Sequence, residues 1–536
     1  MKWWALLLPM LAGSPAWAQE PFRLGVQTHF EQGWGLDWAG IAAGLGAPLV
    51  RDEIGWAEAE RARGRYDFSK SDPYMREIRA QGMAPLIVWT DTNPLYDRKQ
   101  TPHSEDGRAG LVAYLDAMLT HYAGTLTRIE IGNEVNSEEF LSGPFRDDPP
   151  RHLAATVRAV AQGLKPRHPD VEIICAGTNM IPLQFLRDFF RHGGLLDCDA
   201  ISIHPYRRHP ENADLEIAAL RALMRDMGGE KPIHVTEFGK WVEDPAESAV
   251  YMVKMVSILA AEGVGEAYWY ALMDEPWWPN MGLMTPQRAE KPAAEAFRFL
   301  QEKLLPLGRP VPRAATRAAR VFEYGDGEGL VFWGVDGAIA LTGEAAFFDV
   351  TGRPVPRPER LTETPVIALG RRLDLRIVTD APIADSLYQY DTPPWSYFAR
   401  RPGIGLTPLE TMEWRWSSYR GAPDLWPLKI TDAGMTTARF SDGPYHAVER
   451  FTAAAAGRYR VVGWWQASKD SEPSVILVTH NGAGIAEGRT GPGRFRLGPL
   501  DVTLAAGDTV DFEVAPGGPG GDGSLRRRIR IDGPLP

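Results

Sequence analysis

Two glutamates follow apolar, strand-like segments of the chain. Glu134 ends the run Ile129–Glu134, and Glu237 lies in the run Ile233–Phe238. A pair of carboxyl groups can cleave a glycosidic bond, because one protonates the departing oxygen while the other attacks the anomeric carbon or stabilises positive charge there. The two glutamates are 103 residues apart (237 − 134), so the fold has to bring them together.

The elements that would position them alternate regularly between residues 22 and 305. Short β-rich runs are predicted at 23–28, 48–53, 84–89, 128–132, 172–177, 200–204, 233–236 and 266–271. Amphipathic helical segments lie between them, such as 109–122, 153–164, 211–227 and 246–261. Eight strand–helix units of this kind predict an α/β fold with a (β/α)8 TIM barrel over residues 19–305.

In such a barrel the carboxyl ends of the strands carry the active site. Polar and aromatic residues stand at or just after these ends in every predicted unit. They are His29, Arg51, Trp89, Asn133, Glu134, Asn179, His204, Tyr206, Glu237 and Trp269. We expect these side chains to face one cavity.

Four short runs among these residues, taken with the barrel pattern, resemble clan A of the glycoside hydrolases. The runs are Asn133-Glu134, His204-Pro205-Tyr206, Thr236-Glu237-Phe238-Gly239 and Tyr268-Trp269-Tyr270. Within the clan, residues 22–302 resemble family 39 and the bacterial exopolysaccharide hydrolases. This resemblance implies a retaining glycosidase without a metal or other cofactor, in which Glu134 is the general acid/base and Glu237 the nucleophile.

Retention sets a geometric requirement, because the two carboxyl groups have to lie about 5–5.5 Å apart. Glu134 must carry a proton when it acts, while Glu237 must be ionised. We expect Arg51 to hydrogen-bond Glu237 and to hold it anionic. The alternative is a structural ion pair of Arg51 with Asp52 or Glu53.

Other residues of the set are expected to contact the sugar. Asn133 is placed to donate to a 2-hydroxyl group, and Trp89 and Trp269 offer flat faces for a pyranose ring. Further hydrogen bonds to the substrate are expected from His29, Asn179, His204 and Tyr206. The alternatives are a core histidine at His204 and barrel packing for the two tryptophans.

The pattern changes after residue 305, where proline and glycine become frequent and helical periodicity ends. We predict a small β domain over 306–380 and a β-sandwich or jelly-roll domain over 381–536, an accessory module that could bind carbohydrate. In the second domain Trp464 and Trp465 should face opposite sides of a strand. The run Arg526–Arg528 is typical of a basic strand edge, with contact to an acidic polysaccharide as the alternative.

Composition limits the partners and the location. A net charge of −11 argues against nucleic acid as a partner. Residues 1–18 have a lysine, an apolar run and the pattern Ala16-Trp17-Ala18, which predict a signal peptide and export to the periplasm or the cell exterior. No later segment has the roughly 20 apolar residues that membrane insertion needs. Cys175 and Cys198 are interpreted as buried free thiols rather than a disulfide.

The sequence therefore favours a retaining glycoside hydrolase that acts on a polysaccharide, in particular a bacterial extracellular one. A non-catalytic glycan-binding or exopolysaccharide-secretion scaffold is the alternative from another class. An exo-acting β-xylosidase, β-mannosidase or α-L-iduronidase is a narrower alternative within the same class. The distance between the two carboxyl groups and access to them would discriminate between hydrolysis and binding alone.

Overall fold

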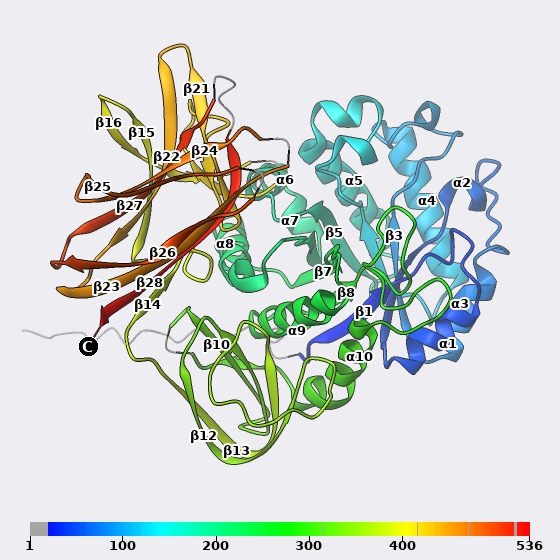
Figure 1. Ribbon diagram of the computed structural model, residues 1–536. Coiled ribbons are helices and arrows are strands. Elements are labelled where there is room, and N and C mark those ends of the chain that lie inside the picture. The colour runs from blue at the N-terminus through cyan, green and yellow to red at the C-terminus, as the bar shows by residue number, and fades with distance from the viewer. Residues whose placement is uncertain are drawn as a thin grey trace, which may run out of the picture.

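The computed structural model describes residues 20–535 apart from 315, 415, 470, 492 and 519–522. The predicted signal peptide, residues 1–18, lies outside these residues. The described chain forms a barrel, a small β-sheet beneath it in the view of Figure 1, and a β-sandwich at its side.

The barrel is closed by parallel strands in the order in which they occur along the chain, and β1 pairs with β8. The strands are β1 (Arg23–Gln27), β2 (Leu49–Glu53), β3 (Ala84–Trp89), β4 (Arg128–Ile131), β5 (Glu172–Asn179), β6 (Ala200–His204), β7 (Ile233–Phe238) and β8 (Glu266–Trp269). Because both faces of each strand are covered, most of their side chains are apolar and buried. The predicted TIM barrel is confirmed.

Helices surround the barrel (Figure 1). They are α1 (Asp37–Gly44), α2 (Trp56–Ala59), α3 (Asp72–Ala80), α4 (Glu105–His121), α5 (Pro149–Leu164), α6 (Leu183–Arg191), α7 (Gly194–Asp197), α8 (Ala213–Asp226), α9 (Ala246–Ala261) and α10 (Pro292–Phe299). The helix α9 is buried along nearly all of its length, because it lies between the barrel and the small sheet.

Side chains alternate between the barrel interior and the helix layer. Leu49, Leu86, Ile174, Ala200 and Tyr268 form an apolar layer of their own. Two residues further along a strand, a side chain points inward again, at a level nearer the carboxyl ends. This alternation places Arg51 of β2 and Glu130 of β4 inside the barrel, above that layer.

Beside the barrel interior, β5 and β6 are joined covalently. Cys175 in β5 and Cys198, just before β6, form a disulfide with their Cα atoms 5.9 Å apart. The interpretation as free thiols was wrong, because Cys198, directly after α7, lies beside β5 within disulfide distance of Cys175. The sequence positions alone did not reveal this approach.

The small sheet has the strand order β12-β13-β11-β10-β9. Its strands are β9 (Val311–Pro312), β10 (Ala319–Tyr324), β11 (Gly329–Gly334), β12 (Ala338–Phe348) and β13 (Val366–Val378). Trp333 and Tyr324 are completely buried against the barrel side, where the Tyr324 hydroxyl lies 3.3 Å from Ser257 Oγ of α9.

The sandwich consists of two antiparallel sheets with an apolar core between them. One sheet holds β14 (Ile383–Asp385), β17 (Glu410–Met412), β18 (Tyr419–Gly421), β19 (Lys429–Ile430), β20 (Gly434–Thr436), β23 (Gly457–Ala467), β26 (Phe495–Leu504) and β28 (Ser524–Leu535). The other holds β15 (Trp395–Arg401), β16 (Gly405–Pro408), β21 (Ala438–Phe440), β22 (Gly443–Thr452), β24 (Ser474–His480), β25 (Ala483–Arg489) and β27 (Thr509–Pro516).

Two sequence predictions can be compared within the first of these sheets. Trp465 is buried in the sandwich core and Trp464 is partly exposed on the other face, as predicted. The prediction of a basic strand edge at Arg526–Arg528 was wrong, because β28 is an interior strand between β20 and β23. Arg527 is instead buried and pairs with Glu449, with 2.7 Å between the guanidinium and the carboxylate.

The sandwich is anchored to the barrel next to α6 and α8 (Figure 1). Leu387 and Tyr388 belong to the apolar cluster of the barrel, and Asn212 donates a hydrogen bond to the Leu387 carbonyl at 2.8 Å. Arg207, which follows β6, pairs with Asp432 of the sandwich at 3.4 Å. Among the described helices, none is long and apolar enough to cross a membrane.

Candidate active site

The position of Glu237 depends on a β-bulge in β7. Val235 pairs with Ala267 of β8, but Phe238 pairs with Trp269, so β7 contains one extra residue between these pairs. A bulge of this kind redirects side chains. As a result, Thr236 bonds to Glu130 inside the barrel while its neighbour Glu237 faces the cavity above.

Arg51 of β2 holds one oxygen of Glu237. Its buried guanidinium donates to Glu237 Oε1 at 2.6 Å, to Glu130 Oε2 at 2.6 Å and to Asn133 Oδ1 at 2.9 Å. Gln27 accepts a further hydrogen bond at 2.8 Å. The expected contact between Arg51 and Glu237 is therefore present, and Glu130 lies deeper in the barrel as a second carboxylate on the same cation.

The other oxygen of Glu237 accepts a hydrogen bond from the Tyr206 hydroxyl at 2.7 Å. His204 Nδ1 lies 3.7 Å from the same oxygen. Burial on its own would raise the pKa of Glu237, but His204, Arg51 and the Tyr206 hydrogen bond outweigh burial and lower it. The site therefore favours an ionised Glu237.

Glu134 lies just beyond β4 on a sharply turned backbone. Its φ of 46° is in the left-handed region, and its N–H donates to the Gly177 carbonyl at 2.5 Å. A Cβ atom at Gly177 would lie 2.4 Å from the Gly132 carbonyl oxygen, so only glycine allows β5 to approach this turn. Asn179, at the end of β5, donates to Glu134 Oε2 at 3.0 Å.

His204 connects the two glutamates from below. Thr236 donates its hydroxyl proton to the Glu130 carboxylate at 2.7 Å, so His204 Nε2, 3.0 Å from that hydroxyl, has to be the donor of their hydrogen bond. The remaining nitrogen, Nδ1, lies 3.3 Å from Glu134 Oε1. Nδ1 therefore either accepts a proton from Glu134 or donates one to it, according to where the proton resides.

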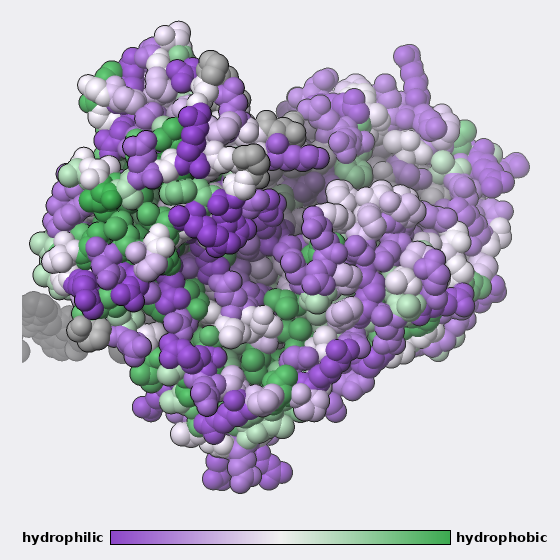
Figure 2. Space-filling view, in the orientation of Figure 1, coloured by the Kyte–Doolittle hydropathy of each residue, from purple (hydrophilic) through white to green (hydrophobic). Residues whose placement is uncertain are grey.

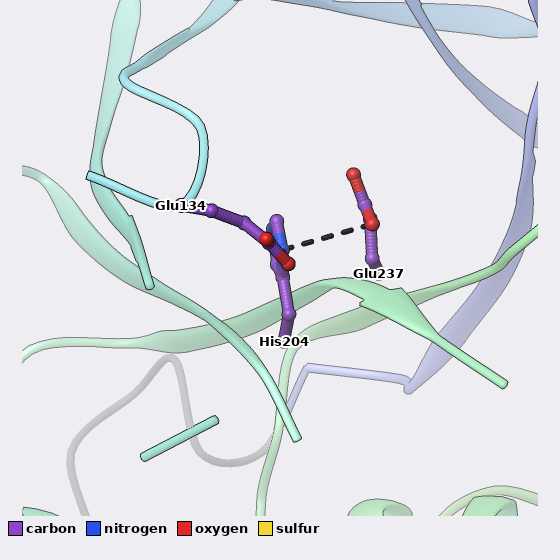
Figure 3. A group of neighbouring side chains, drawn as sticks. All are labelled: Glu134, His204 and Glu237. Atoms are coloured by element: carbon purple, nitrogen blue, oxygen red, sulfur yellow. Dashed lines mark hydrogen bonds and ion pairs between the residues drawn. The ribbon is translucent and has the colours of Figure 1, made fainter. Parts of the chain in front are cut away.

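The two carboxyl groups face each other across the mouth of the barrel (Figure 3). Oxygens of Glu134 and Glu237 and a nitrogen of His204 lie within 4.8 Å of one another. Atoms of this kind could also hold a metal ion. Arg51, Tyr206 and Asn179 already donate to these carboxylates, so fewer of their oxygen lone pairs are left for a cation.

Both glutamates line a cavity of 630 Å³. Five of the predicted residues line it with them, namely His29, Arg51, Asn133, Asn179 and Tyr206. His29 Nε2 has no hydrogen-bond partner among the described residues, and burial lowers the pKa of His29 to about 4. The imidazole beside the cavity is thus neutral, and its Nε2 is buried.

Three predicted contact residues do not line the cavity. His204 is completely buried beneath the glutamates and contacts Glu134 rather than the cavity. Trp89 and Trp269 were assigned to sugar stacking, and this was wrong because strand alternation turns both indoles outward. Trp269 packs edge-on against Phe238, and its indole N–H donates to the Met281 carbonyl.

The aromatic surface comes instead from loops that sequence reasoning missed. These side chains line the cavity and are 45% to 54% exposed: Phe140, Trp241, Trp277 and Trp278. The signal in the sequence was the Trp277-Trp278 pair between prolines, since adjacent tryptophans in a loop have no core to fill. Glu53 and Lys240 are further lining residues that were not predicted.

No protein-family model matches the sequence, and no curated protein matches it. Among solved structures, a family 39 glycoside hydrolase from Bacteroides cellulosilyticus WH2 superposes with a TM-score of 0.57 at 17% identity, over 66% of this chain and 82% of that chain. The chain shares the fold of that hydrolase. The resemblance to family 39 is thus confirmed at the level of the fold, as is a barrel followed by β domains.

Two other solved structures are more distant. A glucosidase from Croceicoccus marinus has a TM-score of 0.48 at 13% identity, over 93% of this chain and 96% of that chain. A family 39 β-xylosidase from Caulobacter crescentus has a TM-score of 0.48 at 16% identity, over 66% of this chain and 96% of that chain.

Proposed function

We propose that the protein hydrolyses glycosidic bonds with retention of anomeric configuration. The observation that carries this proposal is the approach of the Glu134 and Glu237 carboxyl oxygens to within 4.8 Å across an open cavity. A retaining enzyme needs such a short separation, because its second carboxylate attacks the sugar directly. An inverting enzyme leaves room for a water molecule between the two groups.

In this proposal Glu237 is the nucleophile. Arg51 and Tyr206 keep its carboxylate ionised and fixed, so that it attacks the anomeric carbon while Glu134 protonates the departing oxygen. Glu134 then removes a proton from the water that hydrolyses the glycosyl-enzyme bond. His204 contacts Glu134 through Nδ1 and can share that proton during the switch from acid to base.

The rest of the cavity is suited to a sugar ring. Because Asn133 Oδ1 accepts from Arg51, its amide nitrogen is left to donate to a 2-hydroxyl group. Exposed faces of Trp241, Trp277 and Trp278 around the cavity can stack on the apolar side of a pyranose. We infer that the substrate is a polysaccharide and, from the predicted signal peptide at 1–18, that the protein acts outside the cytoplasm.

The first experiment identifies the reaction and its stereochemistry. The purified protein is incubated with a panel of aryl glycosides and bacterial exopolysaccharides, and the products are followed by proton NMR from the first turnovers onward. We expect a product whose initial anomeric configuration equals that of the substrate. An initially inverted product would contradict the roles given to the two glutamates.

The first prediction concerns Glu237→Gln, which keeps the shape of the side chain and removes the nucleophile. We expect turnover to fall by roughly four orders of magnitude or more. Glu243→Gln is the matched control, because Glu243 is exposed, lies close in sequence and does not line the cavity. Near wild-type activity of Glu237→Gln would refute the assignment.

A scaffold that only binds glycans is the alternative function. Paired carboxyl groups at hydrolytic distance, one of them held ionised, argue against it because glycan binding alone has no need for them. A panel without any cleaved glycan, combined with tight binding of one, would favour the scaffold.

A further inference from the structure

Three arginines lie on one sheet of the sandwich, and a fourth lies on the barrel. Arg494 and Arg496 lie at the start of β26, Arg526 lies in β28, and Arg208 follows β6 in the barrel. None of the four forms an ion pair with a carboxylate of the described residues, although the whole chain has a net charge of −11. Together with Trp464 they are called the arginine–tryptophan patch below.

The register of the sheet places the sandwich members of the patch on one face. Trp464 of β23 pairs with Arg496, and Gln466, two residues further along β23, pairs with Arg526. Cross-strand partners and residues two apart share a face, so these side chains point the same way. The Arg494 guanidinium lies 4.0 Å from the centre of the Trp464 ring and donates to Gln466 at 3.3 Å.

The patch continues into the catalytic cavity through Arg208 and Lys240. Burial and then the charge of Arg526 lower the pKa of Arg208, and burial, Arg496 and Arg526 lower that of Arg494. Burial also lowers the pKa of Lys240, Glu247 opposes this effect, and the charge of Arg208 adds to it. Arg208 lines a cavity together with Ala433 of the sandwich, and Gly434, the next residue, pairs with Arg526. Lys240 lines the catalytic cavity and pairs with Glu247 at 3.6 Å. Arg208 therefore lies between the sandwich arginines and the catalytic cavity.

The surface agrees with this path. In Figure 1 the ends of β26 and β28 that carry the patch lie toward the barrel. Figure 2 shows hydrophilic residues on the sandwich side of the hollow between the sandwich and the barrel. A long ligand could thus contact the patch and the cavity at the same time.

We propose that the arginine–tryptophan patch binds the acidic groups of an anionic polysaccharide, and that this polysaccharide is the substrate whose chain continues into the catalytic cavity. This inference rests on the proposed glycosidase function and specifies its substrate class. Arginine forms paired hydrogen bonds to carboxylate and sulfate groups, and the indole face of Trp464 suits the apolar side of a sugar ring.

A single-stranded nucleic acid also has anionic groups and flat rings that such a patch could accept. The polysaccharide is favoured because the neighbouring cavity holds two paired glutamates, which suit a glycosidic bond and have no use in binding nucleic acid. The experiment includes an oligonucleotide so that this occupant is an outcome.

Binding is measured on the full chain carrying Glu237→Gln, so that no ligand is digested. The probes are polygalacturonate, dextran sulfate, neutral dextran and a single-stranded DNA oligonucleotide, each titrated by calorimetry at moderate salt. We expect at least one of the two acidic glycans to bind, and dextran and DNA to bind at least tenfold more weakly. The better acidic probe tells whether carboxylate or sulfate is recognised.

The patch is tested by Arg494→Ser/Arg496→Ser/Arg526→Ser, which should raise the dissociation constant of the bound glycan at least tenfold. Arg208→Ser, in an exposed barrel position, is a second variant and should raise it severalfold. The control is Arg371→Ser/Arg376→Ser/Arg458→Ser, which removes the same charge from exposed positions outside the patch and should change binding less than twofold.

Unchanged binding by the patch variants, or equal loss in the control, would overturn the proposal, as would DNA bound as tightly as the acidic glycans. The outcome is separable from that of the proposed function, because binding needs no turnover. If the wild-type protein cleaves only neutral glycans, the hydrolase function is supported and the acidic-glycan site is refuted. If the patch binds an acidic glycan but no glycan is cleaved, the binding site is supported and the hydrolase function is refuted.

Discussion

At the scale of single residues, the site depends on one cation shared by two carboxylates. Arg51 is 1% exposed and contacts both Glu130 and Glu237, so its charge is balanced by carboxylates inside the barrel. Buried ion pairs of this kind are weak contributors to stability as a whole, but loss of one partner leaves an uncompensated charge behind. The arrangement therefore serves the ionisation of Glu237 more than the stability of the barrel.

We predict that Arg51→Gln moves the acidic limb of the pH profile of kcat/KM to higher pH. Arg51 lowers the pKa of Glu237, so its removal raises that pKa, and the ionised nucleophile is lost at a higher pH than in the wild type. The variant should also be destabilised by about 3 kcal/mol or more. Arg51→Lys is the control, because it keeps the charge and should retain most of the acidic limb. An unchanged limb in Arg51→Gln would contradict this role.

Tyr206→Phe provides an independent test of the same carboxylate. It removes the 2.7 Å hydrogen bond to Glu237 Oε2, and a hydrogen bond to a charged group is worth about 1.5–3 kcal/mol. We expect kcat/KM to fall by roughly tenfold or more, with the acidic limb again moved to higher pH. The control is Tyr270→Phe, because Tyr270 lines the same cavity without a hydrogen bond to Glu237. This variant should leave the acidic limb of the pH profile in place. Equal pH profiles for the two variants would count against the assignment.

Residue types at the strand ends predicted the polar part of the site but not its aromatic part. Arg51, Asn133 and Tyr206 were identified because polar or aromatic groups at the same end of every predicted strand are hard to explain by packing alone. The prediction that Trp89 and Trp269 stack on a sugar was wrong, because neither propensity nor spacing reveals which way the last residue of a strand points. Their replacement by Trp277 and Trp278 comes from a loop, whose path depends on tertiary contacts.

At the scale of elements, β-bulges shape the catalytic face. Because of the bulge in β7, Thr236 points into the barrel interior while its neighbour Glu237 points into the cavity above it. Strand β5 has a similar irregularity between Cys175 and Thr178. Periodicity was sufficient to predict the strands and helices of the barrel. It could not predict the bulges, because an extra residue in a strand leaves the apolar pattern nearly intact.

The disulfide between β5 and β6 makes a prediction at this scale. It closes a loop of 23 residues in sequence, which in the chain-entropy view corresponds to about 3 kcal/mol of stabilisation. We expect Cys175→Ala/Cys198→Ala to unfold at a correspondingly lower urea concentration. Wild-type protein treated with dithiothreitol should approach the double variant, and equal stability of untreated wild type and variant would refute the prediction.

At the scale of the whole molecule, the sandwich is an integral part of the structure. Leu387 and Tyr388, from the segment that follows β14, are buried within the apolar cluster of the barrel. Arg207 lines the catalytic cavity and pairs with Asp432 of the sandwich. The accessory domain thus supports the wall of the active site as well as offering its own surface.

We predict that Tyr388→Ala destabilises the protein by about 3–5 kcal/mol, because a large side chain is removed from a closed core. Its effect should appear as a lower midpoint of thermal unfolding. Tyr445→Ala, in a partly exposed hairpin of the sandwich, is the control and should cost much less. If both variants unfolded at the same temperature as wild type, the two domains would not share a core.

The bond between Cys175 and Cys198 also makes the finished protein depend on where it is produced. A reducing cytosol keeps the two cysteines as free thiols, whereas the periplasm or an extracellular medium oxidises them to a disulfide. Protein produced in a reducing compartment would therefore lack the disulfide, and protein produced in an oxidising compartment would contain it. The two preparations would differ in their resistance to denaturation. The proposed export would deliver the chain to the compartment in which its more durable form is made.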